Sequence, residues 1–485
     1  MFNSSVLPAT TINIGGGTEQ IVRGGRNLFP LLLQGFQGDK QIGIIGWGSQ
    51  GSAQAPNLRD SLEGTDIKVV VGLQAGSSSF EKARKAGFTE ENGTLGEMYS
   101  VISSSDLVIL LISDSAQAEL YKQIFAALKP GATLGLSHGF LLMHLKNVGN
   151  DFLPFPKENN IIMVAPKGMG LSVRRLYVQG KEVNGAGINS SFAVEQDVDG
   201  RATDIALAWS VGIGSPYTFQ TTMRSEVISD IFGERGILLG GVWAVVEVAY
   251  RQFLESCLSP TEAFRQAVES LTGPISKTIS QKGIIGLYNS LDKAGQDEFV
   301  RAYSVSYHAS MPVLTEIYDE VSSGNEVRSV ILAGERLKST PMSTIGDTPM
   351  WRVGIEVRAN RTDVPVNAHV AGMYAGMMMA QIDLLLSKGH PWSEVANESV
   401  IEATDSLNPY MHARGISYMV DNCSRTARLG TRRWGPAFEK ALDCGFGKKE
   451  IEIDADLIEA FKTHPIHAAL AVCAELRPTV DIAVE

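Results

Sequence analysis

Hydrophobic and polar positions divide the chain into two halves with different periods. Between about residue 40 and residue 225, short runs of apolar and β-branched residues alternate with stretches of helical period. This alternation predicts parallel strands connected by helices. Five runs are predicted to be strands, at residues 41–45, 67–71, 107–112, 133–136 and 161–165.

The second half has a different pattern. Beyond Gln220 the 3.6-residue period dominates and strand signals nearly vanish, which predicts an almost wholly helical domain. The turn-rich segment 212–216 marks the neighbourhood of the boundary. We therefore predict one domain over residues 1–223 and a second over residues 224–485.

The helical half also shows a weak internal similarity. Gly372 follows Gly241 by 131 residues, and Pro391 follows Pro260 by the same number. An amphipathic stretch comes after each proline. The offset predicts two related helical units, at about 224–355 and 356–485.

Composition bounds the class of protein. With 485 residues, 44% hydrophobic and 20% charged, the chain has enough core material for two globular domains. A net charge of -11 argues against a nucleic-acid-binding surface. Four cysteines without a CxxC motif indicate a reducing compartment. We expect neither a secretory signal, since the first basic residue is Arg23, nor a membrane span, since no apolar run is long enough.

A glycine-rich loop follows the first predicted strand. Its residues are Gly46, Trp47, Gly48, Ser49, Gln50 and Gly51, and a predicted helix at 52–62 comes next. The GxGxxG spacing between a strand and a helix is typical of dinucleotide binding, although a structural turn would also fit. The second strand ends at Gln74, without the acid that holds the ribose diol in NAD-type enzymes. Ser77 and Ser79 could instead bind a 2′-phosphate, which favours NADPH as the cofactor. The alternative is that the serines only form a flexible loop.

Two polar residues follow later strands. His138 comes after the strand at 133–136, and Lys167 after the strand at 161–165. Both are predicted to lie at the carboxyl edge of the sheet, where open α/β sheets bind ligands. On position alone, a structural histidine and a surface lysine are equally good interpretations.

Two pairs of acids in the helical half have i,i+4 spacing. Asp230 with Glu234, and Glu398 with Glu402, each place two carboxylates on one helix face, where they repel unless a cation offsets them. Oxygen ligands of this kind suit Mg²⁺. Solvated acidic faces are the alternative, particularly for the second pair, which extends a run from Glu394. Ser424 offers a hydroxyl suited to a substrate carboxylate or to a helix N-cap.

Longer motifs connect these residues. They read IGWGSQG, LLISDSAQA, LGLSHGFLL, PKGMGLSVRRLYVQGKEVNGAGIN, SDIFGERGILLGG and NESVIEATDSLNPYMHARGISYMVDNCSRTARLG. On these motifs, from about Gly24 to Gly447, the chain resembles the ketol-acid reductoisomerase (acetohydroxyacid isomeroreductase) family in its long, plant-like type. The resemblance implies an α/β Rossmann-type parallel-sheet domain followed by an all-α, knotted domain with internal duplication.

The resemblance also implies roles for single residues. The metal ligands would be Asp230, Glu234, Glu398 and Glu402, and the substrate would contact Ser424 and Glu402. His138, Lys167 and Glu234 would be the catalytic groups, with proton transfer open between Lys167 and Glu234. Cofactor contacts would come from the glycine loop and from Gln74, Ser77, Ser79, Ser113, Asp114 and His138. Gln74 stands where plant-type relatives carry an arginine, which implies a weaker preference for NADPH over NADH.

The implied reaction is an alkyl shift followed by a reduction. The substrate is a 2-hydroxy-2-alkyl-3-keto acid, 2-acetolactate or 2-aceto-2-hydroxybutyrate, and the product is a 2,3-dihydroxy acid of valine and isoleucine biosynthesis. Two Mg²⁺ ions per site and NADPH are the expected cofactors. We expect a homodimer, in the cytoplasm of a bacterium or the plastid stroma of a plant or alga. The alternatives are a metal-independent β-hydroxyacid dehydrogenase or imine reductase, and a non-catalytic nucleotide-sensing scaffold.

Overall fold

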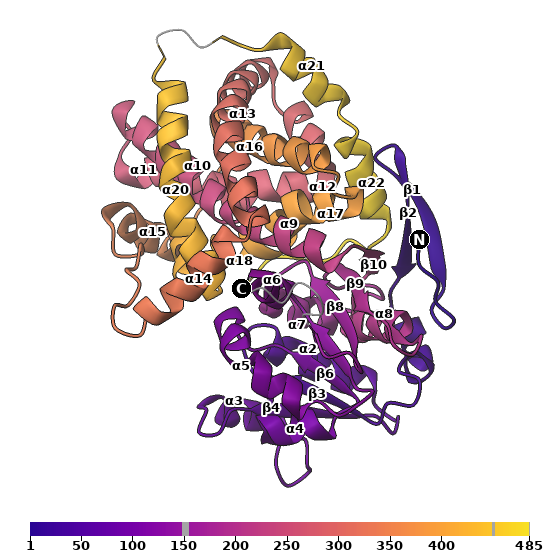
Figure 1. The fold of residues 1–485 in the computed structure, drawn as a ribbon. Helices are drawn as coiled ribbons and strands as arrows, with labels where there is room; N and C mark the ends of the chain where they lie inside the picture. The colour runs from indigo at the N-terminus through magenta and orange to yellow at the C-terminus, as the bar shows by residue number, and fades with distance from the viewer. Residues whose placement is uncertain (148–154, 449–451, 485) are drawn as a thin grey trace. The chain divides into compact units, whose positions relative to one another are not determined.

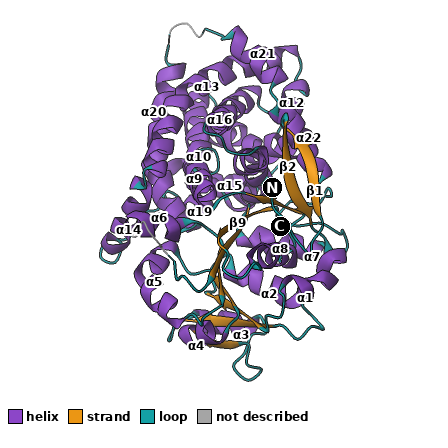
Figure 2. Ribbon diagram, turned by 45° about the vertical axis from the view of Figure 1, so that its right-hand side comes forward, coloured by secondary structure: helices purple, strands orange, loops and turns teal. Residues whose placement is uncertain are grey.

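The chain forms two compact units. A computed structural model describes residues 1–147, 155–448 and 452–484. The sheet unit comprises Met1–Val227 and Val472–Asp481, and the helical unit comprises Ile228–Ala471 and Ile482–Glu485. Figure 1 labels their elements, and in Figure 2 the orange strands belong to the sheet unit.

The sheet unit is built on one sheet of ten strands, as far as the described residues show. Its order is β1-β2-β10-β9-β8-β7-β6-β3-β4-β5. The strands are β1 Ala9–Ile14, β2 Gly17–Arg23, β3 Gln41–Ile45, β4 Lys68–Leu73, β5 Leu95–Glu97, β6 Leu107–Leu110, β7 Thr133–Leu136, β8 Asn160–Pro166, β9 Ser190–Gln196 and β10 Tyr217–Gln220. From β5 to β8 all neighbours are parallel, which confirms the predicted α/β class.

The order in which strands are added to the sheet changes sides at β3, while the strands stay parallel. This strand pairs with β4 on one side and with β6 on the other, so the connections leave in opposite directions. A ligand crevice forms at the carboxyl ends of strands at such a switch point. The glycine loop follows β3 directly, and the fold therefore places it in the crevice position.

The edge of the sheet beyond β8 was not predicted from the hydrophobic pattern. There β9 pairs antiparallel with β8, β10 pairs antiparallel with β2, and β1 and β2 form a hairpin around Gly15 and Gly16, both with positive φ. These strands carry mixed polar and apolar residues because parts of them are exposed. Period-based reading detects buried strands better than such edges.

Helices cover the sheet and connect its strands. In this unit they are η1 Arg26–Leu31, α1 Leu32–Gly35, α2 Gly51–Ser61, α3 Ser79–Lys85, α4 Met98–Ser104, α5 Asp114–Ala127, α6 Phe140–Asn147, α7 Gly170–Gln179 and α8 Ala202–Gly212. The helix predicted at 52–62 is α2. Trp209 of α8 is fully buried, and its indole donates a hydrogen bond to Gln54 of α2 at 2.8 Å, which fixes α2 beneath the loop.

The helical unit contains only helices among its described residues, as predicted. They are α9 Met223–Arg235, which begins in the sheet unit, α10 Gly240–Glu255, α11 Pro260–Phe264, η2 Arg265–Glu269, η3 Leu271–Ile275, α12 Ser276–Asn289, α13 Lys293–Ser322, α14 Asn325–Arg336, α15 Pro349–Ala359, α16 Ala368–Ser387, α17 Trp392–Ala396, η4 Asn397–Ile401, η5 Ala403–Leu407, α18 Asn408–Arg414, α19 Ile416–Asn422, α20 Arg425–Phe446, α21 Ala455–Thr463 and α22 Ile466–Glu475. The knot implied by the resemblance stays a prediction.

Helices α13 and α16 form the centre of this unit. They cross closely because α16 has glycines one turn apart, at Gly372 and Gly376. A Cβ on Gly372 would lie 2.3 Å from the backbone oxygen of Phe299, and a Cβ on Gly376 would lie 2.5 Å from that of Tyr303.

Two apolar segments, Met223–Glu255 and Ala368–Ser387, are long enough and apolar enough to cross a membrane, by length and composition only. Most of their residues are buried inside the protein, as in core helices.

The helical unit repeats one sequence of short elements. The series α11, η2, η3 recurs as α17, η4, η5 with the same lengths, 132 positions later, the difference between Pro260 and Trp392. The predicted offset of 131 is thus one residue short, because Pro260 opens α11 whereas Pro391 is the N-cap of α17. The equal spacing supports the proposed duplication. Of the second unit proposed at 356–485, residues 449–451 and 485 lie outside the described residues.

The two units divide at different points from the boundary drawn on the sequence. The sheet unit runs to Val227, inside α9, rather than to residue 223, and it includes residues 472–481 near the C-terminus. Hydrogen bonds explain the second difference. Arg23 donates to the backbone oxygen of Glu475 at 3.1 Å, and Gln179 donates to that of Asp481 at 2.9 Å. Such long-range pairings leave no periodic signal in the sequence.

Candidate active site

The glycine loop between β3 and α2 has the geometry of a phosphate-binding turn. Gly46 has a φ of 110°, which favours glycine, and a Cβ on Gly51 would lie 2.2 Å from the backbone oxygen of Gly46. A Cβ on Gly48 would instead meet only open space and the backbone oxygen of Leu111 at 4.0 Å. The loop is therefore closed on the protein side and open where a pyrophosphate would approach the start of α2.

Contacts from the turn after β8 hold this loop in place. The side chain of Gln50 donates to the backbone oxygen of Gly168 at 3.0 Å, and the backbone N–H of Gly170 donates to Ser49 Oγ at 3.0 Å. Trp47 packs edge-on against Phe88, with 5.5 Å between ring centroids. The middle residues of the motif thus serve to brace the loop, and its glycines leave room for the ligand.

All predicted sheet-side residues lie at one edge of the sheet. Following the strand order, Lys167 comes after β8, His138 after β7, Ser113 and Asp114 after β6, the glycine loop after β3, and Gln74 after β4. These strands are parallel, so their carboxyl ends meet along the same edge. The tertiary structure therefore brings together residues spread over more than 120 positions of the sequence, from Gly46 to Lys167.

The loop after β4 is polar and exposed at its start. Gln74 is exposed, Gly76 has a positive φ of 77°, and the backbone N–H of Ser79 donates to Ser77 Oγ at 3.2 Å. Helix α3 begins at Ser79. The loop offers hydroxyls, backbone amides and the Gln74 amide, without a basic side chain between residues 74 and 79.

Lys167 is a buried residue of the sheet unit. Its ammonium donates to Glu226 Oε1 at 3.2 Å, and the side chains of the pair are 1% and 0% exposed. The other oxygen of Glu226 accepts from the backbone N–H of Gly139 at 3.2 Å, next to His138. The alternative of a surface lysine is therefore wrong. Glu226 holds both the lysine and the turn that carries the histidine.

His138 lies beside Asp114 at the start of α5. Its Nδ1 is 3.7 Å from Asp114 Oδ1, and both side chains are mostly buried. Asp114 is the first residue of α5, so an acid and a helix N-terminus lie beside the ring at the sheet edge that carries the cofactor loop. The role of His138 as a cofactor contact stays a prediction.

The acids of the second half converge inside the helical unit. Asp230 of α9 and Glu398 of η4 offer carboxylate oxygens within 4.8 Å of each other, although they are far apart in the sequence. Asp230 and Glu398 are thus two of the four predicted ligands that the helical unit brings together. Glu394 and Glu398 are fully buried, so Glu398 does not belong to a solvated acidic face, while Glu402 is partly buried. Glu394 instead binds His390 at 2.7 Å.

The pKa of the Cys423 thiol depends on the charges of the other predicted ligands. Burial, together with the negative charges of Glu234, Glu402 and Asp230, raises the pKa of this thiol to about 12. Electrostatic influence of this kind falls off with distance, so these three acids lie in the same region of the helical unit as Cys423. The next residue, Ser424, is the N-cap of α20 and accepts from Ala427 N–H at 3.0 Å. Capping uses an oxygen lone pair, and the hydroxyl proton is still able to bind a carboxylate.

This group of residues fits a divalent cation. Buried carboxylates close to each other are costly unless a cation or proton compensates them. Carboxylate oxygens are hard ligands that suit Mg²⁺ or a similar hard ion. Glu398 lies on a π-helix, and π-helical turns are frequent at functional sites. Asp230 and Glu398 thus fit a metal ion by their geometry, and the roles of Glu234 and Glu402 as ligands stay predictions.

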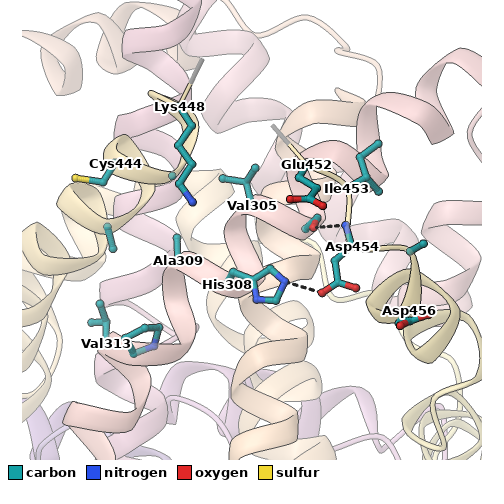
Figure 3. A pocket seen from close by; sticks show the side chains of 15 residues that line it. Val305, His308, Ala309, Val313, Cys444, Lys448, Glu452, Ile453, Asp454 and Asp456 are labelled. Atoms are coloured by element: carbon teal, nitrogen blue, oxygen red, sulfur yellow. Dashed lines mark hydrogen bonds and ion pairs between the residues drawn. The ribbon is translucent and has the colours of Figure 1, made fainter. Parts of the chain in front are cut away.

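A separate cavity of about 890 Å³ lies in the helical unit (Figure 3). Its walls come from α13, the end of α20 and residues 452–456. His308 turns toward Asp454 there, with Nε2 3.0 Å from Oδ2. No predicted site residue lines the cavity. Mixed small apolar and charged walls do not supply the convergent carboxylates of the α9 and η4 group, so the cavity is not the candidate active site.

Glu226 is the residue that sequence reasoning missed as a functional group. It extends the spacing of Asp230 and Glu234 by one turn, so that the three acids occur at 226, 230 and 234. This i,i+4 series was the available signal. Its partner Lys167 lies 59 residues earlier, and no local pattern connects the two.

The glycine loop on the Rossmann-type sheet and the acids of the helical unit are typical of one class of protein. This class comprises oxidoreductases that bind a nicotinamide dinucleotide on the sheet and have a helical domain with a carboxylate site. Two family models match the chain, the acetohydroxy acid isomeroreductase NADPH-binding domain at residues 37–218 and the ketol-acid reductoisomerase C-terminal domain at residues 223–363. The chain belongs to the ketol-acid reductoisomerase family.

Individual relatives support this assignment. Chloroplastic ketol-acid reductoisomerases of Spinacia oleracea and Pisum sativum are each 57% identical to the chain over its whole length, which covers 83% and 85% of those proteins. The solved structure of an NADH-preferring ketol-acid reductoisomerase from an uncultured archean matches with a TM-score of 0.56 and 26% identity, over 67% of this chain and 95% of that one.

Proposed function

We propose that this protein is an NADPH- and Mg²⁺-dependent enzyme that rearranges a 2-hydroxy-2-alkyl-3-keto acid and reduces the product to a 2,3-dihydroxy acid. The substrates are 2-acetolactate and 2-aceto-2-hydroxybutyrate, in valine and isoleucine biosynthesis. Membership of the family supports the reaction. The observation that carries it in the structure is the approach of buried Glu398 to Asp230 within 4.8 Å.

Asp230, Glu234, Glu398 and Glu402 would hold two Mg²⁺ ions. When bound, the metal ions would favour ionisation of the C2 hydroxyl and polarise the neighbouring ketone, and NADPH would supply the hydride. Ser424 would bind the substrate carboxylate with its hydroxyl proton while its oxygen caps α20. Glu402, which is only partly buried, would reach both metal and substrate.

Proton transfer is assigned to Lys167, with Glu234 as the alternative. Burial beside Glu226 holds the Lys167 ammonium at a fixed point on the strand edge, where it would donate a proton and, as the neutral amine, take one back. His138 and Asp114 would contact the cofactor from the neighbouring turns. The glycine loop, Ser113 and the Gln74 to Ser79 loop would bind its phosphates and ribose.

We propose a homodimer and neither a nucleic-acid nor a membrane partner. The two plant relatives are named as chloroplastic, which supports the plastid stroma for a chain from a plant or alga. In a bacterium the same enzyme would be cytoplasmic.

The test is an assay with acetolactate, with and without Mg²⁺, using NADPH and NADH in turn. NADPH oxidation that requires both acetolactate and Mg²⁺ is the expected result. Glu234→Gln should abolish the alkyl shift, whereas reduction of the pre-formed 3-hydroxy-2-keto acid should survive in part. Full isomerisation by this variant would remove Glu234 from the metal site.

A metal-independent β-hydroxyacid dehydrogenase or imine reductase is the alternative with the same two-domain layout. Such enzymes need no group of buried acids. A chelator titration separates the two, because activity that survives complete removal of divalent ions would favour the alternative.

A further inference from the structure

Arg235 is a fully buried arginine that directly follows the predicted metal ligand Glu234 on α9. Its Nη1 lies 3.4 Å from Glu234 Oε2 and donates to the backbone oxygen of Ile231 at 3.2 Å. Its Nε donates to Glu326 Oε2 at 2.6 Å. The guanidinium therefore lies between the metal ligand on one side and a second buried acid on the other.

Glu326 belongs to the first turn of α14 and has a side chain only 3% exposed. Its second oxygen accepts from Arg433 Nη1 at 2.7 Å and from the indole of Trp434 at 3.0 Å. Both partners belong to α20. Glu326 is thus bound from three directions, and its position is determined by α9 and α20 together.

The same guanidinium also contacts the helix that Ser424 caps. Arg235 Nη2 lies 3.5 Å from the backbone oxygen of Thr426, in the first turn of α20. One turn later, a Cβ on Gly430 would lie 2.6 Å from Arg235 Cζ, so α20 passes directly over the guanidinium. Arg235 therefore connects the helix of the first acid pair with the helix that presents the predicted substrate residue.

We infer that Arg235 and Glu326 are positioning residues for the proposed metal and substrate site. Arg235 orients the Glu234 carboxylate and aligns the first turn of α20. Glu326 compensates the guanidinium charge, so that this charge does not oppose cation binding at Glu234. The inference rests on the proposed function, since it assumes that Glu234 holds a divalent ion.

The physical argument is electrostatic. Two like charges repel strongly in a site that excludes water, and a buried guanidinium without its acid would act directly against a divalent ion a few ångströms away. Removal of the Glu326 charge also leaves Glu234 as the acid nearest to Arg235. The guanidinium would then compete with the metal for the same carboxylate.

Glu326→Gln tests the charge. Calorimetric titration of the full-length protein with Mg²⁺ should show a dissociation constant at least tenfold higher than that of the unsubstituted protein. The dissociation constant for NADPH should not change, because the cofactor loop belongs to the sheet unit. Unchanged Mg²⁺ affinity in a folded Glu326→Gln protein would overturn the inference.

Glu269→Gln is a matched control. Glu269 also has a side chain 3% exposed, and it accepts from Arg361 Nε at 2.6 Å, the same geometry on a helix without predicted ligands. It should lose stability like Glu326→Gln and keep its Mg²⁺ affinity. An equal loss of Mg²⁺ affinity in both variants would mean a general effect of broken buried ion pairs and would overturn the inference.

A double variant separates charge from position and covers the case that Glu326→Gln does not fold. Arg235→Met with Glu326→Gln removes both charges, so Mg²⁺ affinity should return to within about threefold of the original. The KM for acetolactate should stay raised, because nothing then aligns α20. A normal KM would overturn the positioning role. Absence of Mg²⁺ binding in the unsubstituted protein would instead contradict the proposed function itself.

Discussion

The side-chain oxygen of Gln381 accepts a hydrogen bond from the backbone N–H of Ile237 at 2.9 Å, in the fully buried turn that follows α9. On its other side the Gln381 amide donates to Ser399 Oγ at 3.2 Å and to the backbone oxygen of Glu398 at 3.4 Å. One amide of α16 thus joins the end of the helix with the first acid pair to the π-helix with the second.

Gln381→Met should loosen this connection. The variant keeps the approximate size of the side chain but leaves the Ile237 N–H without its acceptor, which costs about 1–3 kcal/mol of unfolding free energy. We expect weaker Mg²⁺ binding in addition, measured by calorimetry beside denaturant unfolding. Ser306→Ala, which removes a buried hydrogen bond from α13 to the backbone oxygen of Met373 on α16, should lower stability only. Intact Mg²⁺ affinity in Gln381→Met would refute the role.

Two glycines of the cofactor loop should respond differently to alanine. Gly48→Ala places its methyl group in open space, so the melting temperature should be unchanged while the KM for NADPH rises at least tenfold. Gly51→Ala forces a methyl group against the backbone oxygen of Gly46 and should destabilise the sheet unit even without cofactor. Thermal unfolding with and without NADPH distinguishes the two. A stable Gly51→Ala with normal NADPH binding would contradict the geometry.

Gln74 should control the choice between NADPH and NADH. Gln74→Arg adds a positive charge to an exposed loop without other basic residues, where a 2′-phosphate would be bound. The KM for NADPH should fall by a larger factor than the KM for NADH, in initial-rate assays at low ionic strength. Gln74→Met is the neutral control. Equal effects on both cofactors would show that this position does not read the phosphate.

The four cysteines should fall into two classes of reactivity. Burial raises the pKa of Cys473 to about 11, and burial with the charges of nearby acids raises that of the partly exposed Cys423 to about 12, whereas Cys257 and Cys444 are exposed. A raised thiol pKa means that the reactive thiolate is scarce at every pH well below that value. At pH 8 a thiol reagent should therefore modify Cys257 and Cys444 quickly, and the other two only after unfolding. A third fast thiol in the native protein would contradict this.

The sequence by itself determined the parallel sheet, the helical second half and the place of the cofactor loop. These features depend on local patterns: the β3 and β7 strands are bounded by turn residues, and the glycine spacing needs no distant partner. Motif resemblance added the proposed role of the acid pairs as metal ligands. Period alone left open whether Glu398 was a ligand or part of a solvated face.

Only the tertiary structure decided which of these residues meet. Burial of Glu398, its approach to Asp230, the pairing of Lys167 with Glu226 and the attachment of residues 472–481 to the sheet unit all join positions far apart in the chain. Such contacts depend on the packing of whole helices and on charge compensation in a buried environment. Neither quantity is encoded in the spacing of neighbouring residues, because the loss of chain entropy on closing a long loop is repaid only when the complete core forms.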